Sequence, residues 1–244
     1  MRQFGLIGYP LGHSFSKGFF TAKFAAEAID ARYENFPLEN INGFQQLLQE
    51  HPNLEGLNVT IPHKENVIPF LHHQSPVVAA IGACNCIQIQ NQQLTGFNTD
   101  VVGFEKSLCK KLDSHHEAAL VLGTGGASKA VQYVLQQLQI PFTVISRKAV
   151  PEKGILDYGS LEKELQQRAT LWINTTPLGM TPNTGTMPPL DYDTISNRHY
   201  LYDLVYNPAE TKFLAMGKEK GAVIENGHDM LVIQAEESWK IWNK

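Results

Sequence analysis

Cysteine is scarce in this chain of 244 residues, which argues against an architecture held together by disulfides. There are three cysteines, Cys84, Cys86 and Cys109, and an odd, small number of this kind is typical of a reducing compartment. The pair in "ACNC" has no second ligand pair at zinc spacing. We therefore expect buried free thiols and no metal site.

The chain also has no surplus of positive charge and no long apolar run. Its net charge is −4 and its lysines and arginines are scattered, so no basic face for nucleic acid is expected. The apolar stretch near the start is interrupted by Gly8, Pro10 and His13, and no segment reaches the length of a membrane span. We expect a soluble cytoplasmic protein that acts on small molecules, as a monomer or a homodimer.

Alternating strand and helix patterns run through the first hundred residues. Strands are expected at "FGLIG", "YENFPL" and "EGLNVTI", and helices at about 16–29 and 42–49. Two short strands follow around the turn Asn91-Gln92, and then a helix capped by Thr99 or Asp100. This half of the chain is therefore predicted to be an α/β unit.

A second α/β series begins at "AALVLGTGGASKAVQYVLQQL" and continues through "PFTVISR", "TLWINTT", "HYLYDLVY" and "AVIENG". The last stretch, "HDMLVIQAEESWKIW", is predicted to be a helix with enough apolar surface to pack back on the first unit. We expect two α/β domains around a cleft, one formed by residues 1–102 and completed by a C-terminal helix at 228–244, the other by residues 103–227.

A glycine-rich turn opens the second series. Gly123, Gly125 and Gly126 lie between an apolar strand and a helix, where backbone N–H groups can face a pyrophosphate. Ser128 stands where the third glycine of G-x-G-x-x-G belongs, so a purely structural tight turn remains an alternative on spacing alone.

The next strand favours NADP over NAD. An NAD site uses an acidic residue about twenty positions after the glycines, whereas an NADP site uses cations for the 2′-phosphate. No carboxylate occurs between Gly123 and Glu152, and the strand ends in Ser146, Arg147 and Lys148. Arg147 suits a phosphate because its planar fork donates twice. The competing interpretation is a solvated arginine at the end of a strand.

Eight short blocks, in order along nearly the whole chain, resemble the shikimate dehydrogenase family. In the first half they are "GYPLGHSFS", "NVTIPHK", "GACNC" and "GFNTDVVGF". In the second half they are "GTGGASKA", "INTTPLGM", "DLVYNPAETKFL" and "NGHDMLVIQAEESW". The resemblance implies an N-terminal substrate domain, a Rossmann-type NADP domain, and NADPH-dependent reduction of 3-dehydroshikimate to shikimate on the route to chorismate and the aromatic amino acids.

The resemblance also implies the catalytic pair. Lys64 would donate a hydrogen bond or a proton to the ketone oxygen, and Asp100 would be the carboxylate beside it. Without the family pattern, Lys64 would be interpreted as a solvated cation and Asp100 as a helix cap.

Further roles follow from the same blocks. The substrate carboxylate would be held by Ser14 and Ser16, with Tyr206 near it, and the substrate hydroxyls by Thr60, Asn85 and Gln234; Asn58 would support the site from its rim. Cofactor residues would be Gly123, Gly125, Gly126 and Ala127 at the pyrophosphate, Ser146, Arg147 and Lys148 at the 2′-phosphate, and Thr175, Leu204 and Gly227 near the ribose or nicotinamide. For each residue alone, a turn, a cap or a core hydrogen bond is the alternative.

Three departures from the family pattern are visible. Lys17 replaces the proline that usually follows S-x-S, Cys86 stands where a threonine is usual, and Ser146-Arg147-Lys148 replaces the common N-R-T. Three alternatives to shikimate dehydrogenase activity stay open: a dehydrogenase that also accepts quinate, one that uses NAD, and a ligand-binding relative without turnover. Retention of both Lys64 and Asp100 argues against the last of these.

Overall fold

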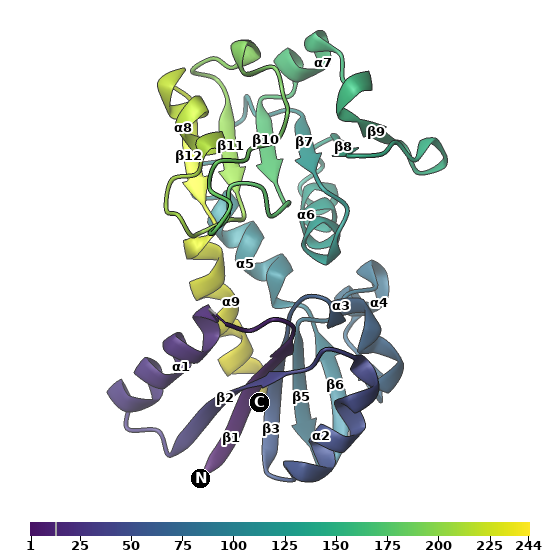
Figure 1. Ribbon diagram of the computed structural model, residues 1–244, viewed down its shortest axis with the longest axis vertical. Coiled ribbons are helices and arrows are strands. Elements are labelled where there is room, and N and C mark those ends of the chain that lie inside the picture. Colours follow the sequence, from purple (N-terminus) through teal and green to yellow (C-terminus); the bar gives the residue numbers. More distant parts are fainter. Residues whose placement is uncertain (13) are drawn as a thin grey trace. The chain divides into compact units, whose positions relative to one another are not determined.

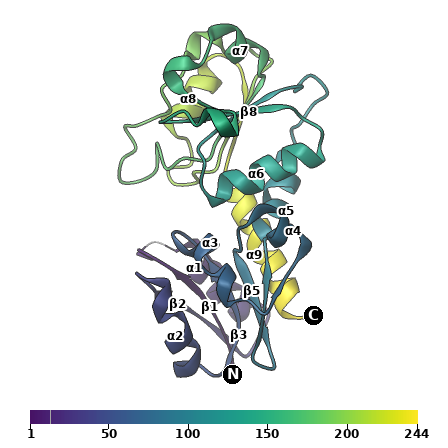
Figure 2. The ribbon, with the colours of Figure 1, turned by 90° about the vertical axis from the view of Figure 1, so that its right-hand side faces the viewer.

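The computed structural model describes residues 1–12 and 14–244 and divides them into two compact units. The first comprises Met1–Gly103 with Leu231–Lys244, and the second comprises Phe104–Met230. Helices α5 (Thr99–Leu108) and α9 (His228–Trp242) each contain one of the boundaries. The two units are described separately below (Figures 1 and 2).

The first unit is built on a mixed six-stranded sheet with the order β2-β1-β3-β5-β6-β4. Its strands are β1 (Arg2–Gly8), β2 (Ala31–Pro37), β3 (Leu54–Val59), β4 (His73–Gln74), β5 (Cys86–Gln90) and β6 (Gln93–Phe97). Strand β1 pairs in parallel with β2 and β3, and β5 is antiparallel to β3 and β6. Asn91 and Gln92, both at positive φ, form the predicted turn between β5 and β6.

Helices cover both faces of this sheet. They are α1 (Phe15–Ala26), α2 (Phe44–Glu50), α3 (His63–Asn66), α4 (Pro76–Ile81) and the main part of α9. Along β1, Phe4 and Leu6 point into one core cluster and Ile7 into the other, as the two-residue period of a strand requires. Trp242 of α9 stacks on Phe4 and donates from Nε1 to the Ile87 carbonyl at 2.9 Å. The predicted C-terminal helix therefore packs on the first sheet.

The second unit has an all-parallel sheet with the order β12-β11-β10-β7-β8-β9. Its strands are β7 (Ala119–Leu122), β8 (Phe142–Ser146), β9 (Ile155–Asp157), β10 (Leu171–Asn174), β11 (Tyr200–Asp203) and β12 (Val223–Asn226). Counted from β7 as the first strand, this is the 3-2-1-4-5-6 order of dinucleotide-binding folds. The prediction of a Rossmann-type second half is confirmed.

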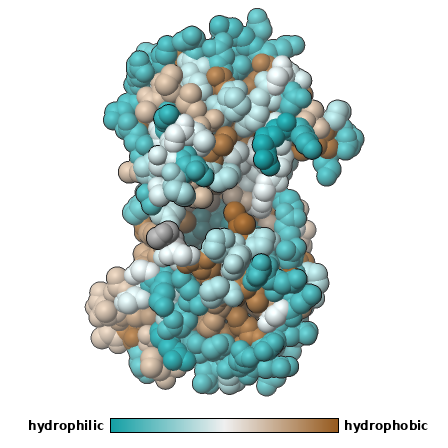
Figure 3. Space-filling model, in the orientation of Figure 1, coloured by the Kyte–Doolittle hydropathy of each residue, from teal (hydrophilic) through white to brown (hydrophobic). Residues whose placement is uncertain are grey.

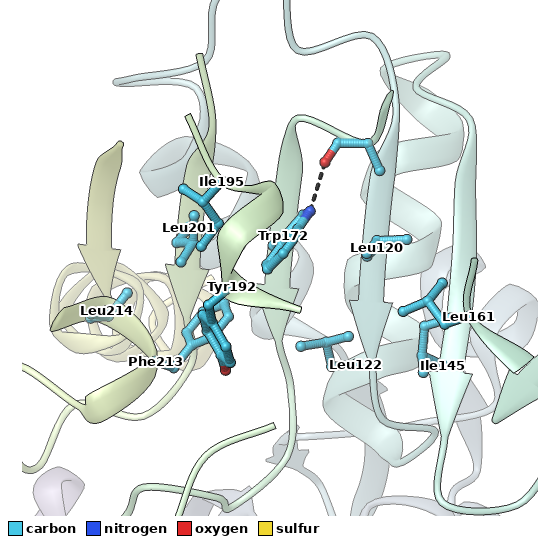
Figure 4. Packing of buried hydrophobic residues seen from close by; sticks show 11 residues of the cluster. Leu120, Leu122, Ile145, Leu161, Trp172, Tyr192, Ile195, Leu201, Phe213 and Leu214 are labelled. Carbon is cyan, nitrogen blue, oxygen red and sulfur yellow. Dashed lines mark hydrogen bonds between the residues drawn. The ribbon is translucent and has the colours of Figure 1, made fainter. Parts of the chain in front are cut away.

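Apolar side chains of alternate strand positions form the core of the second unit. On one face Leu120, Leu122, Trp172 and Leu201 form one cluster with Phe213 and Leu214 of α8 (Lys212–Glu219), as Figure 4 shows. Leu165 of α7 (Lys163–Arg168) packs against the same cluster. Trp172 Nε1 is not left unpaired there, because it donates to the Ala169 carbonyl at 2.7 Å. Helix α6 (Gly126–Gln137) buries a stripe of its own made of Ala130, Val131, Val134 and Leu135.

One predicted cap is wrong. Helix α5 begins at Thr99, and Asn98 caps it by accepting the Val101 N–H on Oδ1 at 3.2 Å. Asp100 lies within the first turn, where a carboxylate interacts favourably with the helix dipole but is not the cap. The Asp100 side chain is therefore available for another partner.

The visible surface of each unit is mostly polar, with small separate apolar patches (Figure 3). Among the described residues, no helix has the length and apolar character needed to cross a membrane. All three cysteines are free, with Cys84 and Cys86 buried and Cys109 exposed. Burial raises the pKa of the Cys84 thiol to about 12, which makes a thiolate unfavourable at neutral pH.

Candidate active site

Lys64 and Asp100 form a close ion pair inside the first unit. Lys64 Nζ donates to Asp100 Oδ2 at 2.7 Å, and the two side chains are 17% and 3% exposed. Exposure this low removes most of the solvent screening that weakens surface pairs. The ammonium keeps a partly open side, whereas the carboxylate is enclosed. The pair can therefore hold a charged proton donor at a fixed point.

Local structure holds both partners. The short helix α3 carries Lys64, and the preceding residue, His63, is buried and donates from Nε2 to the Leu38 carbonyl at 2.5 Å. The Lys64 carbonyl accepts the Cys84 N–H at 2.7 Å. On the other side, the cap residue Asn98 donates from Nδ2 to the Ala83 carbonyl at 2.9 Å. The segment around residues 83–86 thus fixes the backbone on both sides of the pair.

Asn85 is joined to the residue that precedes Asp100. Its Oδ1 accepts the Thr99 N–H at 2.6 Å, and its Nδ2 donates to Thr99 Oγ1 at 3.1 Å. Asn85 and Thr99 are 4% and 1% exposed. One Asn85 amide hydrogen has no assigned partner among the described residues, so this side chain retains a donor for a ligand hydroxyl.

Asn58 lies beside Asn85, and both its carboxamide oxygen and its carboxamide nitrogen are hydrogen-bonded within the protein. Oδ1 accepts the Tyr33 hydroxyl at 2.9 Å, and Nδ2 donates to the Asn85 carbonyl at 3.3 Å and to Ser238 Oγ at 2.9 Å. The motif comparison did not identify Tyr33 or Ser238. An inward tyrosine in a strand is a weak signal, and Ser238 is one turn after Gln234 on α9, a spacing that could have suggested it.

The two serines predicted to bind a carboxylate lie at the start of α1. Ser14 is the N-cap and accepts the Lys17 N–H at 3.4 Å, a bond that does not use its own hydroxyl hydrogen. Proline at position 17 would have no N–H to donate, so the Lys17 departure adds this capping bond. Ser16 lies against Tyr33, whose hydroxyl has a pKa raised by burial and lowered less strongly by its hydrogen bond with Ser16. His13, within the same block, lies outside the described residues.

Thr60 and Gln234 belong to the first unit as well. Thr60 follows β3 directly, and its backbone N–H donates to the Ile7 carbonyl at 2.9 Å. Gln234 is half-buried on α9, and its carbonyl accepts the Ser238 hydroxyl at 2.9 Å. Cys86, another departure from the family pattern, is buried beside Ser238. Burial raises the pKa of its thiol, so Cys86 is a small apolar residue here.

The glycine turn is the corresponding feature of the second unit. Gly123 has φ of +114°, and a Cβ there would be 2.5 Å from Thr175 Oγ1, so no other residue fits. Gly125 precedes α6 without a side-chain cap, and a Cβ on it would meet no atom within 4 Å. No side chain caps the start of α6 at Gly126 and Ala127, which leaves the first N–H groups of this helix without a capping side chain, the arrangement that binds a phosphate at a helix N-terminus.

Ser128 occupies the position of the third glycine in the G-x-G-x-x-G pattern, and its contacts show why a serine fits there. It is fully buried, its hydroxyl donates to the Gly123 carbonyl at 2.7 Å, and it accepts from Gln132 Nε2 at 3.0 Å. The hydroxyl thus braces the turn from within. The turn keeps its shape without a third glycine.

Ser146, Arg147 and Lys148 follow at the carboxyl end of β8, which is the neighbour of β7 in the sheet. Arg147 and Lys148 are exposed, and neither has a salt bridge to a carboxylate within the described ranges. Tyr158 lies near Arg147, although burial has the larger effect on the tyrosine and raises its pKa. Two cations with no internal counterion fit the 2′-phosphate of NADP.

The remaining predicted cofactor residues lie at the same carboxyl edge. Thr175 Oγ1 donates to the Leu122 carbonyl at 2.6 Å, which ties the end of β10 to the glycine turn. Gly227 has no room for a side chain, because a Cβ would overlap the Leu204 carbonyl. Tyr206 is half-buried in the second unit, and burial raises the pKa of its hydroxyl. The structure thus brings Tyr206 into the unit with the glycine turn.

Asp203 is a buried carboxylate that the motif comparison did not single out. It accepts from Thr211 Oγ1 at 2.6 Å, from Asn174 Nδ2 at 2.9 Å and from the Val205 N–H at 3.0 Å. Burial nevertheless outweighs these donors and raises its pKa to about 6. Its partners are the last residue of β10 and two residues that follow β11, so it fixes the backbone at this edge. A carboxylate at the end of an apolar strand is the signal that could have identified it.

Comparisons with known proteins agree with these features. Residues 6–87 match the model of the shikimate dehydrogenase substrate binding domain. The shikimate dehydrogenase (NADP+) of Oleidesulfovibrio alaskensis is 39% identical over 249 residues, which cover 98% of this chain and 88% of the relative. That of Caldanaerobacter subterraneus subsp. tengcongensis is 35% identical over 261 residues, covering 99% of this chain and 91% of the relative.

The fold is shared as well. The crystal structure of shikimate 5-dehydrogenase from Thermus thermophilus, in complex with NADP(H) and shikimate, superimposes with a TM-score of 0.88 at 29% identity, covering 99% of this chain and 93% of that one. Sequence identity above one third over almost the full length is decisive, and the chain belongs to the shikimate dehydrogenase family.

Proposed function

We propose that this protein catalyses the reversible, NADP-dependent reduction of 3-dehydroshikimate to shikimate, a step toward chorismate and the aromatic amino acids. The observation that carries the proposal is the enclosed pair of Lys64 and Asp100, with Nζ and Oδ2 at 2.7 Å, in the unit whose sequence matches the family's substrate binding domain. A ketone reduction needs such a donor where negative charge develops on oxygen.

Lys64 acts on the ketone oxygen. In reduction its ammonium donates a hydrogen bond and then a proton to that oxygen, and in the reverse direction it takes the proton from the substrate hydroxyl. Asp100 orients the ammonium, since its Oδ2 accepts the hydrogen bond from Nζ at 2.7 Å and the two opposite charges attract. The low exposure of both side chains strengthens this effect.

The other residues of the first unit bind and orient the substrate. Ser14 caps α1 through its hydroxyl oxygen and not through its hydroxyl hydrogen, so it can donate to the carboxylate together with Ser16. Thr60, Asn85 and Gln234 bind ring hydroxyls, and Tyr206 of the second unit is assigned to the carboxylate. Short donors and acceptors of this kind suit a polyhydroxylated acid.

NADP belongs to the second unit, and when bound it supplies the hydride or accepts it. Gly123, Gly125, Gly126 and Ala127 would hold the pyrophosphate at the uncapped start of α6. Ser146, Arg147 and Lys148 would hold the 2′-phosphate. Thr175, Leu204 and Gly227 would line the ribose and nicotinamide. Residues 1–102 with 228–244 would form the substrate domain and 103–227 the NADP domain.

The working context is part of the proposal. A net charge of −4 with no clustered cations suits a cytoplasmic enzyme with a small-molecule substrate and no nucleic-acid or membrane partner. We propose that the protein is a monomer or a homodimer. Light scattering after size exclusion would contradict this assignment if it gave a larger assembly.

One assay tests the activity. The purified chain is mixed with shikimate and NADP, and formation of NADPH is followed by its absorbance; the same mixture is then prepared with quinate, and again with NAD. We expect turnover of shikimate with NADP, and kcat/KM at least about tenfold lower for NAD. No turnover with any pair would contradict the proposed activity, and a higher kcat/KM for quinate would reassign the substrate.

A further inference from the structure

The orientation of the Asn58 carboxamide is determined by its surroundings. A backbone carbonyl, that of Asn85, faces one end, so this end must be Nδ2, which donates at 3.3 Å. The other end is then Oδ1, and it accepts the Tyr33 hydroxyl at 2.9 Å. Both hydrogens of Nδ2 are used, because Ser238 accepts the second one. Asn58 therefore has no free donor for a substrate.

Ser238 joins three elements of the first unit. Its hydroxyl hydrogen goes to the Gln234 carbonyl one turn earlier on α9, at 2.9 Å. Its oxygen accepts from Asn58 on β3 and lies 3.4 Å from Thr99 Oγ1 on α5. Ser238 is completely buried. Loss of this hydroxyl would leave the second Asn58 hydrogen buried without a partner, which is the costly way to break a hydrogen bond.

A continuous path leads from these residues to the catalytic pair. Thr99 is held through its N–H and its hydroxyl by the Asn85 carboxamide, and Asp100 is the next residue. The Asn85 carbonyl is in turn held by Asn58. A shift of Asn58 or Ser238 therefore moves the first turn of α5, and with it the Asp100 carboxylate that orients Lys64.

We propose that Tyr33 and Ser238 are positioning residues of the active site: through Asn58 and Thr99 they set the places of Asn85 and of the Asp100–Lys64 pair. Neither side chain touches the substrate in this proposal, which rests on the proposed function for its kinetic consequence. The structural part of the proposal, that the position of the Asp100–Lys64 pair depends on these two hydroxyls, does not depend on which substrate the protein binds.

Two substitutions remove only the hydroxyls. Tyr33→Phe keeps the ring, which stacks on Phe20 with centroids 4.6 Å apart, and Ser238→Ala removes a single oxygen. We expect each variant to fold and to lower kcat/KM for shikimate about tenfold, with KM for NADP within about twofold of the parent value. The double variant should lose less than the product of the two, because both act on Asn58.

The chain offers a matched control in the second unit. The Tyr202 hydroxyl donates to Ser107 Oγ at 2.9 Å, and both residues are fully or almost fully buried. Tyr202→Phe and Ser107→Ala remove the same kinds of hydroxyl from a buried tyrosine–serine bond at the last turn of α5, seven residues after Asp100, where neither side chain is bonded to Asn58, Asn85 or Thr99 in the described part of the chain. We expect a comparable fall in melting temperature, with kcat/KM within about twofold of the parent value.

A second measurement needs no turnover. The rate at which acetic anhydride acetylates Lys64 is followed by peptide mass spectrometry, with exposed Lys17 as the internal reference. Tyr33→Phe and Ser238→Ala should change the Lys64 rate at least about threefold, and the control variants should not. If the parent enzyme turns over shikimate but both variants keep its kcat/KM, the positioning role is wrong. If the parent enzyme does not turn over shikimate, the proposed function is wrong, and the acetylation rates still test the positioning role. That role is wrong if Lys64 is acetylated at the same rate in the two variants as in the parent enzyme.

Discussion

Lys64 Nζ and Asp100 Oδ2 lie 2.7 Å apart although the residues are separated by 36 positions, and the carboxylate is 3% exposed. A buried ion pair of this kind adds little to stability, because desolvation of both charges offsets their attraction. In the proposed function its value is catalytic, since the pair would fix a proton donor in the unit that carries the proposed substrate residues.

Replacement of Lys64 by alanine should collapse turnover. We expect Lys64→Ala to lower kcat at least about a hundredfold, because the developing charge on the ketone oxygen loses its proton donor. NADPH binding, measured by titration of its fluorescence, should stay nearly unchanged. Lys110→Ala is the control, since Lys110 is 59% exposed and pairs with Asp229 in the second unit. Turnover preserved in Lys64→Ala would remove this residue from the chemistry.

Replacement of Arg147 should separate the two cofactors. The exposed guanidinium has no carboxylate partner in the described part of the chain, so a 2′-phosphate is the group it is free to bind. Arg147→Ala should raise KM for NADPH at least about tenfold more than KM for NADH. Arg168→Ala, at the end of α7, should change neither. Equal losses for both cofactors would contradict the assignment to the 2′-phosphate.

The fold was predictable wherever strands and helices are long enough to show their period. Strand β1 alternates Phe4 and Leu6 against Ile7, and the parallel series of the second unit is visible as separated apolar runs. Strand β4 has two residues and β9 has three, too few for any period to appear. The cap of α5 was predicted one or two residues too late, because Asn98, Thr99 and Asp100 are all residues that cap helices.

The candidate site was only partly predictable, and for a different reason. Lys64 and Asp100 were identified from motifs, since nothing local to either residue indicates a partner 36 positions away. Tyr33 belongs to none of the eight blocks, Ser238 lies within the last block without a role attached to it, and the Asn58–Ser238 bond joins residues 180 positions apart. Contacts of this kind depend on the packing of α9 on the sheet, which the pattern of a single segment does not contain.

The packing of α9 can be tested at Gly56. A Cβ at this position of β3 would overlap the indole of Trp242, which is held in place by its bond to the Ile87 carbonyl. Gly56→Ala should lower the free energy of unfolding by about 1–3 kcal/mol in urea denaturation, as overpacking does. Gly18→Ala is the matched control, because Gly18 lies within α1 with nothing within 4 Å of a Cβ. Gly18→Ala should raise the free energy of unfolding by about 0.5–1 kcal/mol. If Gly18→Ala lowered the free energy of unfolding as much as Gly56→Ala does, contact with Trp242 would not be the cause.

Two buried histidines of the second unit should make stability depend on pH. His116 Nδ1 accepts the Asp113 N–H at 2.9 Å, and His199 Nδ1 accepts the Ser196 N–H at 3.0 Å, so protonation of either ring would break a bond that holds a turn. Burial lowers the pKa of both imidazoles, because it disfavours the charged ring. The folded state thus takes up these protons at lower pH than the unfolded state does.

The sign of the effect follows from this order. As pH falls through about 6.5, the unfolded chain gains protons first, and the free energy of unfolding decreases. The melting temperature should therefore be lower at about pH 5.5 than at about pH 7.5, and His199→Asn, whose Oδ1 can accept the same N–H, should reduce the difference. Asp203 has the opposite effect on the pH dependence of stability, because its pKa is raised to about 6 and the folded state takes up this proton at higher pH than the unfolded state does. The pH dependence is therefore compared between variants, so that the contribution of Asp203 is the same in each. His73→Gln, at an exposed position of the first unit, controls for the loss of an imidazole. If His199→Asn and His73→Gln changed the pH dependence equally, burial of His199 would not be its cause.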